Sequence, residues 1–438
     1  MQHRMWRRSR RARVFATMSV LATLTMSACG SGSGDGSGGG SADGPVDLRM
    51  TVWTADESQL ALFQEIADAY VAENADTVSS VTFETLPFEE YTTGLTTQIA
   101  GGNPPDLAWI FESSAPEFVQ SGALMDLRPV LSETEGYQVD DLDSDALRLW
   151  ESDDALYAYP FSNSPFGVFV NTDQLAAAGQ PMPAELVADG TWTWDAAADM
   201  AAAAAAKSGK SGLVVRDFNY SNWGNLATIW NGWGARPWSE DGTSCEFDSP
   251  EMVGALSWFH EQVFTESAIP GPGTTADFFA GDAAMTVTQI SRASALDGSF
   301  GWDLLPLPAG PEQQQNVIGQ AGIGVLADGP NAEAAADFLA YFTNPENSER
   351  LAQYFPPPRT SLLNAETLKA ANPKLSAEQL QSVVVEGIQG AVTKPAHPNF
   401  AKLQQTIRAE LDSLWKADAD VEAVTASVCE AATPLLSD

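Results

Sequence analysis

The sequence predicts an α/β fold whose sheet is mostly parallel and covered by helices on both faces. Three observations predict this fold class. Short apolar runs alternate with helical patterns from Val46 onward, the 438 residues are enough for two or three domains, and 44% apolar residues with 13 Trp supply the cores. In such sheets, ligands lie beyond the carboxyl ends of the strands.

The first predicted elements follow in βαβ order. Residues 48–53 alternate like a strand, and Phe63, Ile66 and Tyr70 have the spacing of a helix over 60–73. A strand over 81–86, a helix over 88–100 and a strand over 106–110 come next, with Gly-Gly-Asn-Pro-Pro ending that helix. Later elements are a strand over 166–171 and helices over 194–207, 250–263, 331–342 and 400–414.

The net charge argues against nucleic acid and anionic lipid headgroups as partners. The chain has 58 Asp and Glu against 22 Lys and Arg, a formal net charge of −36. Six of the Arg lie before Val14, so the excess of acid is larger still in the remainder. Phosphate-rich partners need clustered Lys and Arg.

The N-terminus has the three parts of an export signal. An Arg-rich run ends at Arg13, an apolar stretch covers 14–26, and small residues lead to Cys29. Ser27-Ala28-Cys29 resembles a bacterial lipobox, so we predict a lipoprotein signal peptide over 1–28 and lipidation of Cys29; an ordinary secretory signal is the alternative. The Gly- and Ser-rich composition of residues 29–45 predicts a flexible tether, which would hold the protein at the outer face of the cell membrane. Both the Sec and the Tat export routes stay open.

Two further cysteines, Cys245 and Cys429, predict a disulfide in an oxidising compartment, with two separate buried thiols as the alternative. No Cys or His pair has the spacing of metal ligands, so we expect no metal site and no cofactor.

Several short motifs occur in a characteristic order. They are Thr-Val-Trp-Thr at 51–54, Gly-Asn-Pro-Pro-Asp-Leu at 102–107, Gln-Ser-Gly-Ala-Leu at 120–124, Gly-Asp-Ala-Ala-Met-Thr at 281–286 and Ala-Ala-Ala-Asp-Phe-Leu at 334–339. With the lipobox and the length, this order resembles the family 1 extracellular solute-binding proteins, the sugar-binding lipoproteins of bacterial ABC importers. The resemblance covers Asp47 to the C-terminus.

The resemblance implies a two-lobed clamshell of the type II-like periplasmic-binding-protein class, with the ligand in the cleft between the lobes. The expected crossings lie near Ser162, Gln289 and Gly329. Lobe 1 would then hold 46–161 plus 290–329, and lobe 2 would hold 162–289 plus 330–438. It also implies a monomer that delivers its ligand to the permease subunits of a transporter.

The resemblance also assigns ligand contacts to loops in both lobes. Gln289 and Ser291 stand where relatives commonly have a Gly followed by a bulky aromatic residue, which removes one stacking platform. The expected contacts are Trp53, Glu57, Phe111, Glu112 and Ser113 in lobe 1, Asn163 and Ser164 at the hinge, and Asn219, Tyr220, Trp223, Gln289, Ser291 and His397 beyond it.

A cluster of indoles gives an argument that is independent of the resemblance. Trp223, Trp230, Trp233 and Trp238 lie within sixteen residues, beside amides and glycines. Aromatic faces cover the C–H side of a pyranose, while amides and carboxylates bond its hydroxyls. Trp223, Trp230 and Trp233 are therefore candidate platforms, with core packing as the alternative. We assign Trp192 and Trp194 to a helix start, and Trp150, Trp258, Trp302 and Trp415 to packing.

Enzymatic motifs are incomplete in this sequence. Gly209-Lys210-Ser211 lacks the first Gly of a phosphate loop, His260-Glu261 lacks the second His of a zinc protease, and no Gly-x-Ser-x-Gly elbow occurs. We therefore expect a carbohydrate receptor and not an enzyme. The alternatives are the same fold binding a glycerol phosphodiester or a polyamine, a sensory lipoprotein, and a glycoside hydrolase.

Overall fold

The computed structural model describes residues 44–215, 220 and 222–437. The predicted signal peptide, the lipidation site Cys29, most of the tether and the candidate contact Asn219 lie outside these residues. Within the part of the chain that is described, no helix is long and apolar enough to cross a membrane.

The first lobe begins with the predicted βαβ units. Strand β1 (Val46–Val52) pairs in parallel with β2 (Val78–Thr85) on one side and with β3 (Leu107–Phe111) on the other. Helix α1 (Glu57–Glu73) starts at Asp56, whose carboxylate accepts the backbone N–H groups of Ser58 and Gln59. Helix α2 (Tyr91–Ala100) connects β2 to β3. These elements enclose a first hydrophobic cluster that includes Met50, Phe63 and Trp109.

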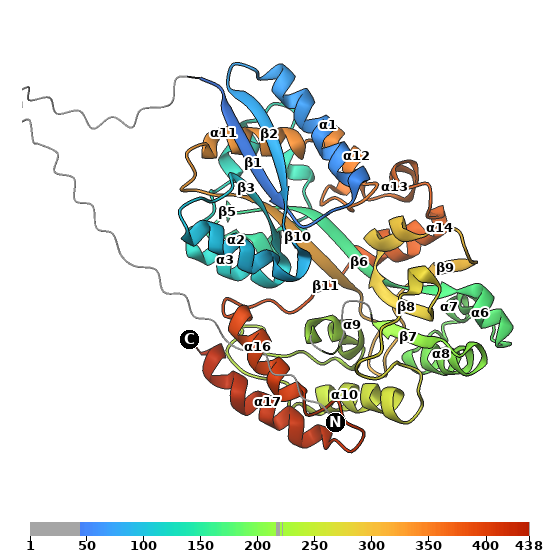
Figure 1. Cartoon of the computed structure of the whole chain (residues 1–438). Coiled ribbons are helices and arrows are strands. Elements are labelled where there is room, and N and C mark those ends of the chain that lie inside the picture. The colour runs from blue at the N-terminus through green and yellow to red at the C-terminus, as the bar shows by residue number, and fades with distance from the viewer. Residues whose placement is uncertain (1–43, 216–219, 221, 438) are drawn as a thin grey trace, which may run out of the picture. The chain divides into compact units, whose positions relative to one another are not determined.

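Two long strands join the lobes. Strand β6 (Tyr159–Asn171) is buried along all 13 residues; its first part pairs with β10 (Val317–Val325) and its last part with β8 (Ala283–Gln289). Strand β10 also pairs with β3, so one sheet runs through both lobes in the order β2-β1-β3-β10-β6-β8-β7 (Figure 1). The pairings of β10 with β3 and β6 are antiparallel. The mostly parallel sheet predicted from the sequence is therefore a mixed one, because its central strands reverse direction.

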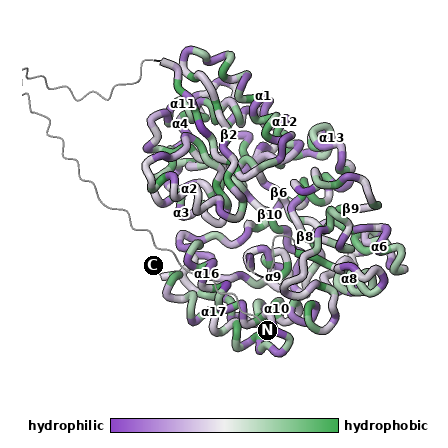
Figure 2. Tube along the Cα trace, viewed as in Figure 1, coloured by the Kyte–Doolittle hydropathy of each residue, from purple (hydrophilic) through white to green (hydrophobic). Residues whose placement is uncertain are grey.

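The second lobe packs helices around β7 (Ser211–Val215) and β8, which are parallel neighbours. Its two hydrophobic clusters include Phe247 and Leu403 in one and Phe169 and Leu380 in the other. Along α8 and α17, hydrophobic and hydrophilic residues are interspersed, as expected for helices with one covered face (Figure 2). The main helices here are α8 (Trp194–Ser208), α10 (Pro250–Phe264), α13 (Ala365–Ala371), α16 (Phe400–Leu411) and α17 (Val421–Leu436).

The described chain contains further α-helices and strands. They are the helices α3 (Ala115–Ser121), α4 (Arg128–Glu133), α5 (Ser144–Leu147), α6 (Thr172–Ala177), α7 (Pro183–Ala188), α9 (Ala227–Trp230), α11 (Ala332–Phe342), α12 (Pro345–Leu351), α14 (Ala377–Gln379) and α15 (Glu386–Ile388), and the strands β4 (Glu151–Ser152), β5 (Ala155–Leu156), β9 (Trp302–Leu305) and β11 (Val392–Thr393).

The packing differs from the predicted lobe boundaries in two segments. Helices α11 and α12 were expected in lobe 2, but Phe338, Phe342 and Leu351 pack in the first cluster. Residues 290–316 were expected in lobe 1, but β9 pairs with β6 beside β8, and Leu304 packs in the second lobe. The chain therefore crosses between lobes in β6, in β10 and after Phe355, and not near Gln289 and Gly329.

Strand β10 depends on a glycine at its contact with the first lobe. A Cβ at Gly322 would lie 2.7 Å from Cζ3 of Trp150 and 2.9 Å from Cβ of Ala158. Trp150 is completely buried, so its ring cannot move aside into solvent.

We expect Gly322→Ala to lower the free energy of unfolding by about 1–3 kcal/mol through overpacking. Urea unfolding followed by far-UV circular dichroism measures the change. Gly271→Ala is the matched control, because its Cβ would meet only Val263, at 3.9 Å, and stability should be unchanged or slightly raised. Equal effects of the two substitutions would contradict this account of β10.

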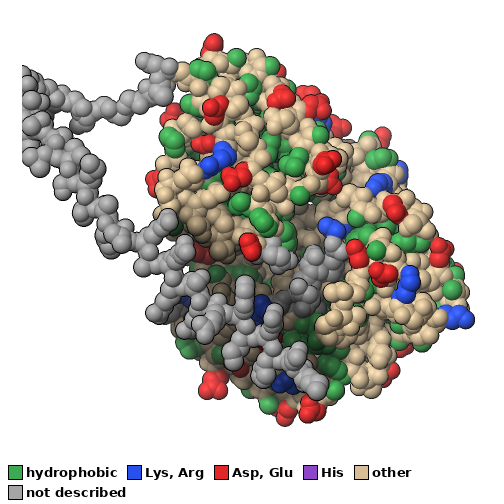
Figure 3. Space-filling view, in the orientation of Figure 1, with side chains coloured by type: hydrophobic (Ala, Val, Ile, Leu, Met, Phe, Trp, Pro, Cys, Tyr) green, Lys and Arg blue, Asp and Glu red, His purple; other side chains and the backbone are tan. Residues whose placement is uncertain are grey.

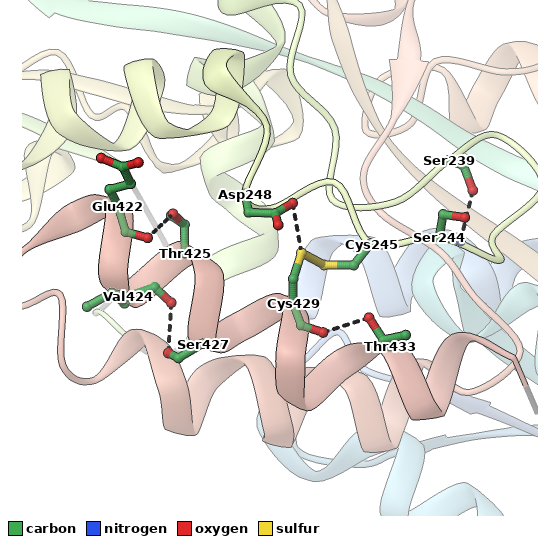
Figure 4. Close-up of a disulfide and its surroundings, with 10 residues drawn as sticks. All are labelled: Ser239, Ser244, Cys245, Asp248, Glu422, Val424, Thr425, Ser427, Cys429 and Thr433. Atoms are coloured by element: carbon green, nitrogen blue, oxygen red, sulfur yellow. Dashed lines mark hydrogen bonds between the residues drawn. A yellow bond between two sulfur atoms is a disulfide. The ribbon is translucent and has the colours of Figure 1, made fainter.

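The predicted disulfide is present between Cys245 and Cys429, whose Cα atoms are 5.4 Å apart and which are 184 residues apart in sequence. Figure 4 shows Cys429 on α17 reaching the loop that carries Cys245, with Sγ of Cys429 lying 3.4 Å from Oδ1 of Asp248. The bond ties the helix pair α16 and α17 to the loop that precedes α10.

Replacing both cysteines by serine should lower the free energy of unfolding by about 2–5 kcal/mol, because the open chain gains conformational freedom when unfolded. Thermal unfolding with and without reductant measures this. Reductant should destabilise the native chain and leave the double variant unaffected; an equal melting temperature for the two oxidised chains would refute the expectation.

Candidate ligand cleft

A cavity of about 460 Å³ lies between the two lobes, where the shared strands β6 and β10 form its floor. Cavities that hold small ligands in proteins have about this size. Its walls come from loops that follow the strands of each lobe. The lining residues are Trp53, Thr54, Ala55, Asp56, Gln59, Phe88, Trp109, Phe111, Glu112, Phe161, Ser162, Ser164, Asn222, Asn225, Gln289, Ser291, Arg292, Ser294, Gly319, Gln320, Ala321, Phe355 and Lys394.

The wall from the first lobe is aromatic. Trp53 follows β1, Phe88 follows β2 and Phe111 ends β3, so all three stand at the carboxyl edge of the parallel strands. The rings of Trp53 and Phe111 are stacked with centroids 4.1 Å apart, and Phe88 meets Phe111 edge-on at 5.1 Å. Trp109 packs behind Trp53 at 4.7 Å. These contacts hold a rigid apolar face toward the cavity.

Serine hydroxyls make the floor polar, and hydrogen bonds on the opposite face of the strands hold it in place. The side chain of Gln320 on β10 is 2% exposed; it accepts from Nε1 of Trp150 at 2.9 Å and donates to Oδ1 of Asn163 at 2.7 Å. Ser162 and Ser164 on β6 line the cavity. Asn163 lies between them in sequence and lines a different cavity, because successive side chains of a strand point to opposite faces. The side chain of Gln320, the cross-strand partner of Asn163, points to that same opposite face.

The wall from the second lobe is polar and includes cations. Gln289 ends β8, and the turn after it contributes Ser291 and Arg292. The backbone N–H of Ser291 donates to Oγ of Ser164 at 3.3 Å, which fixes this turn to the floor. Asp and Glu side chains are spread over the visible face of both lobes, together with Lys and Arg (Figure 3). The cavity lining holds two cations, Arg292 and Lys394, and two carboxylates, Asp56 and Glu112.

An ion pair crosses the cleft. Nζ of Lys394, between β11 and α16, lies 2.8 Å from Oε1 of Glu112, in the turn that follows β3. The Glu112 side chain is 4% exposed and that of Lys394 is 22% exposed. Both residues also line a second cavity of about 250 Å³, to which Ser113 and Gln404 contribute.

Asp56 lines the cavity, but its carboxylate already accepts hydrogen bonds from backbone N–H groups at the start of α1. Partial burial raises its pKa, yet hydrogen bonds from Ser58 and Gln59 outweigh this, and the pKa is lower than usual. Asp56 therefore stays ionised as the N-cap of α1. Glu57, the acceptor expected from the sequence, is exposed on the first turn of α1 and is absent from the cavity lining.

Seven of the expected contacts lie at the two cavities. Trp53, Phe111, Glu112, Ser164, Gln289 and Ser291 line the larger cavity, and Ser113 lines the smaller one. Whether they bind a ligand stays a prediction.

The predicted indole platforms lie in the core of the second lobe instead. Trp223 and Trp230 are each 1% exposed, and both pack against Phe247 at 5.5 and 6.1 Å. Trp233 packs against Trp258 at 5.3 Å. None of the three lines the cleft cavities. Their role in this structure is core packing, the alternative given in the sequence analysis. Trp194 begins α8, as predicted.

Tyr220 and His397 also have structural contacts. The hydroxyl of Tyr220 donates to the carbonyl oxygen of Pro270, and its ring packs against Trp415. His397 is buried beside Trp238, with ring centroids 5.5 Å apart. Neither residue lines the two cleft cavities.

Several lining residues were not predicted from the sequence. Phe88 lies three residues after the end of β2, so the rule that ligands lie at the carboxyl edge could have found it. Asn222, Gln320 and Lys394 carry no such signal, because their positions depend on the packing between the lobes. Among the described residues, no group of three or more His, Cys, Asp and Glu is placed to hold a metal ion.

Comparison with known proteins identifies the family. Residues 65–377 match the model of the bacterial extracellular solute-binding proteins, and the chain belongs to that family. An uncharacterized lipoprotein in the oleD 5′ region of Streptomyces antibioticus is 25% identical over 362 residues, which are 78% of this chain and 75% of that protein. Members of the family bind solutes and are not catalysts.

Solved structures show the same two-lobed fold. The substrate-binding protein Lmo0181 from Listeria monocytogenes, in complex with cycloalternan, matches with a TM-score of 0.78 and 22% identity over 89% of this chain and 99% of that one. The GacH receptor of Streptomyces glaucescens, solved unliganded and with acarbose, matches at 0.75 with 20% identity over 90% and 98%. UgpB from Mycobacterium tuberculosis, in complex with glycerophosphocholine, matches at 0.71 with 18% identity over 90% and 98%.

His397 should make stability depend on pH. Its Nε2–H donates to the carbonyl of Gly242 at 3.1 Å and its Nδ1 accepts from the backbone N–H of Asn399 at 3.0 Å, which requires the neutral ring. Burial lowers its pKa, partly opposed by the bond to Gly242. Below pH 6.5 the unfolded chain takes up a proton first, so the contribution of His397 to stability is lost as the pH falls through the lowered folded pKa.

We expect the difference in unfolding free energy between the native chain and His397→Gln to shrink as the pH falls from 7 to 5. Urea unfolding at a series of pH values measures this difference. Because both chains have the same carboxylates, the pH-dependent contribution of these groups to the unfolding free energy cancels in the difference. A difference that stays constant over this range would show that His397 is not held neutral.

Proposed function

We propose that this protein is a lipid-anchored receptor at the outer face of the cell membrane, which captures a mono- or oligosaccharide and delivers it to the permease of an ABC transporter. It acts as a monomer, needs no cofactor and leaves its ligand chemically unchanged. The lipid anchor follows from the lipobox that ends at Cys29.

One observation carries the carbohydrate assignment: the cleft presents an aromatic wall opposite a polar one. The stacked rings of Trp53 and Phe111 offer an apolar surface of the kind that covers the C–H face of a sugar ring. Gln289, Ser291 and Asn222 face it with amides and hydroxyls that can donate to and accept from sugar hydroxyls. Similar proteins in complex with cycloalternan and acarbose support the same ligand class.

Delivery to a permease follows from the way the cleft is built. Three chain crossings join the lobes, and a ligand between them contacts both walls, so binding favours the closed arrangement of the lobes. The closed arrangement is then the signal that a transporter partner recognises.

A thermal-shift screen of the full chain tests the ligand class. The compounds are mono- and oligosaccharides, polyols, glycerol phosphodiesters and polyamines. A ligand at a hundred times its dissociation constant adds about 2.7 kcal/mol to stability, enough for a clear shift. A saturable shift with saccharides, without turnover of the sugar, is the expected result. If only a phosphodiester or a polyamine shifts the melting temperature, the protein is still a solute receptor, but the assignment of a carbohydrate ligand is wrong.

The aromatic wall predicts a specific loss of affinity. Trp53→Ala removes the stacking face and should weaken binding of the saccharide found in the screen about tenfold or more, which is 1.4 kcal/mol or more. Isothermal titration calorimetry measures the dissociation constant. Trp302→Ala is the control, because Trp302 is likewise partly buried but packs near Phe169, away from the cavity. Equal affinities of the two variants would contradict the stacking role.

A further inference from the structure

We propose that the ion pair of Glu112 and Lys394 divides the ligand cleft into two subsites and thereby limits the length of the saccharide that the protein accepts. This inference rests on the proposed carbohydrate function and names the residues that set the size of the ligand.

The two cavities adjoin at the ion pair. Five residues line both of them: Phe88, Phe111, Glu112, Asn222 and Lys394. Phe88, Phe111 and Glu112 come from the first lobe, whereas Asn222 and Lys394 come from the second. The contact of Nζ of Lys394 with Oε1 of Glu112, at 2.8 Å, therefore spans the cleft at the boundary between the cavities.

The smaller cavity has the chemistry of an extension of the larger one. Phe400 adds an aromatic ring, and Ser113, Gln404 and Arg408 add a hydroxyl, an amide and a guanidinium. Its volume of about 250 Å³ is below the range of independent ligand sites, which begins near 300 Å³. It is therefore more suitable for the end of a longer ligand than for a ligand of its own.

The ion pair resists being opened by a ligand. Glu112 is 3% exposed, and a buried carboxylate that loses its cation is costly unless new hydrogen bonds replace the pair. The ring of Phe166 lies 6.0 Å from Nζ of Lys394 and further restrains the cation. A short saccharide fills the larger cavity without disturbing the pair, whereas a longer one has to break it.

The test compares binding of maltose and maltotetraose by the full chain and by its Lys394→Met variant. Methionine keeps an aliphatic side chain of similar length but cannot pair with Glu112. We expect the ratio of the two dissociation constants to shift about tenfold in favour of the tetrasaccharide. The swapped double variant Glu112→Lys/Lys394→Glu restores the pair and should restore the native ratio. An unchanged ratio in Lys394→Met would overturn the inference.

A matched control separates this effect from the loss of any ion pair. Arg128 pairs with Glu151 in the first lobe, and neither residue lines the two cleft cavities. Arg128→Met should leave the ratio of dissociation constants at its native value. A shift as large as that of Lys394→Met would assign the effect to general loosening of the fold and overturn the inference.

A crystal structure of the ligand-free Lys394→Met chain gives a readout that needs no sugar. The inference requires one continuous cavity from Trp53 to Gln404. Two separate cavities would refute it. If the cavities merge but neither the native chain nor any variant binds either saccharide or any sugar of the screen, the partition is supported and the proposed carbohydrate function fails.

Discussion

The antiparallel pairing of β6 with β10 is the constraint on which the rest of the molecule depends. Each strand takes part in both lobes, so the sheet of one lobe continues into the sheet of the other. The same two strands form the floor of the cleft, with Ser162 and Ser164 toward the cavity and the side chain of Gln320 on the opposite face. Any movement of the lobes has to twist or bend this pair, and the hydrogen bonds of Gln320 to Asn163 and Trp150 hold the floor in place while it does so.

The different character of the two walls follows from which strand ends face the cleft. In the first lobe, aromatic residues stand at or just after the ends of three parallel strands, and they pack on one another without help from the second lobe. In the second lobe, β8 ends in Gln289 and leads into a turn of serines and Arg292. The apolar face of a ligand is thus oriented by one lobe and its hydroxyls by the other. Gly319 permits this arrangement, because a Cβ there would overlap the amide of Gln289 at 1.9 Å.

Local patterns predicted several of the longer elements but only part of the cleft. Helical spacing predicted α1, α8, α10, α11 and α16 to within a few residues, because each buries one continuous face. Strand β10 was missed: its glycines interrupt the apolar pattern, and they are there because Trp150 and Leu124 pack against the backbone. The indoles were misassigned for a related reason. Trp223 and Trp230 are of the residue type that stacks on sugars, but here their large side chains fill the hydrophobic core of the second lobe. Residues such as Lys394 depend on contacts between distant segments, which no local pattern contains.

The bond between Cys245 and Cys429 also sets an order of events in folding. Strands β1 to β3 lie close together in sequence and can pair early, while the second lobe takes its elements from the middle and the end of the described chain. Its sulfur–sulfur bond cannot form until 184 further residues have followed Cys245 and an oxidant has removed two electrons. Until then α17 is held by its packing against α10 and α16 and by contacts such as the hydrogen bond from the Asn399 side chain to the carbonyl oxygen of Leu435. The bond therefore adds its stabilisation to the second lobe only after the last described helix has been synthesised and the chain has reached an oxidising compartment.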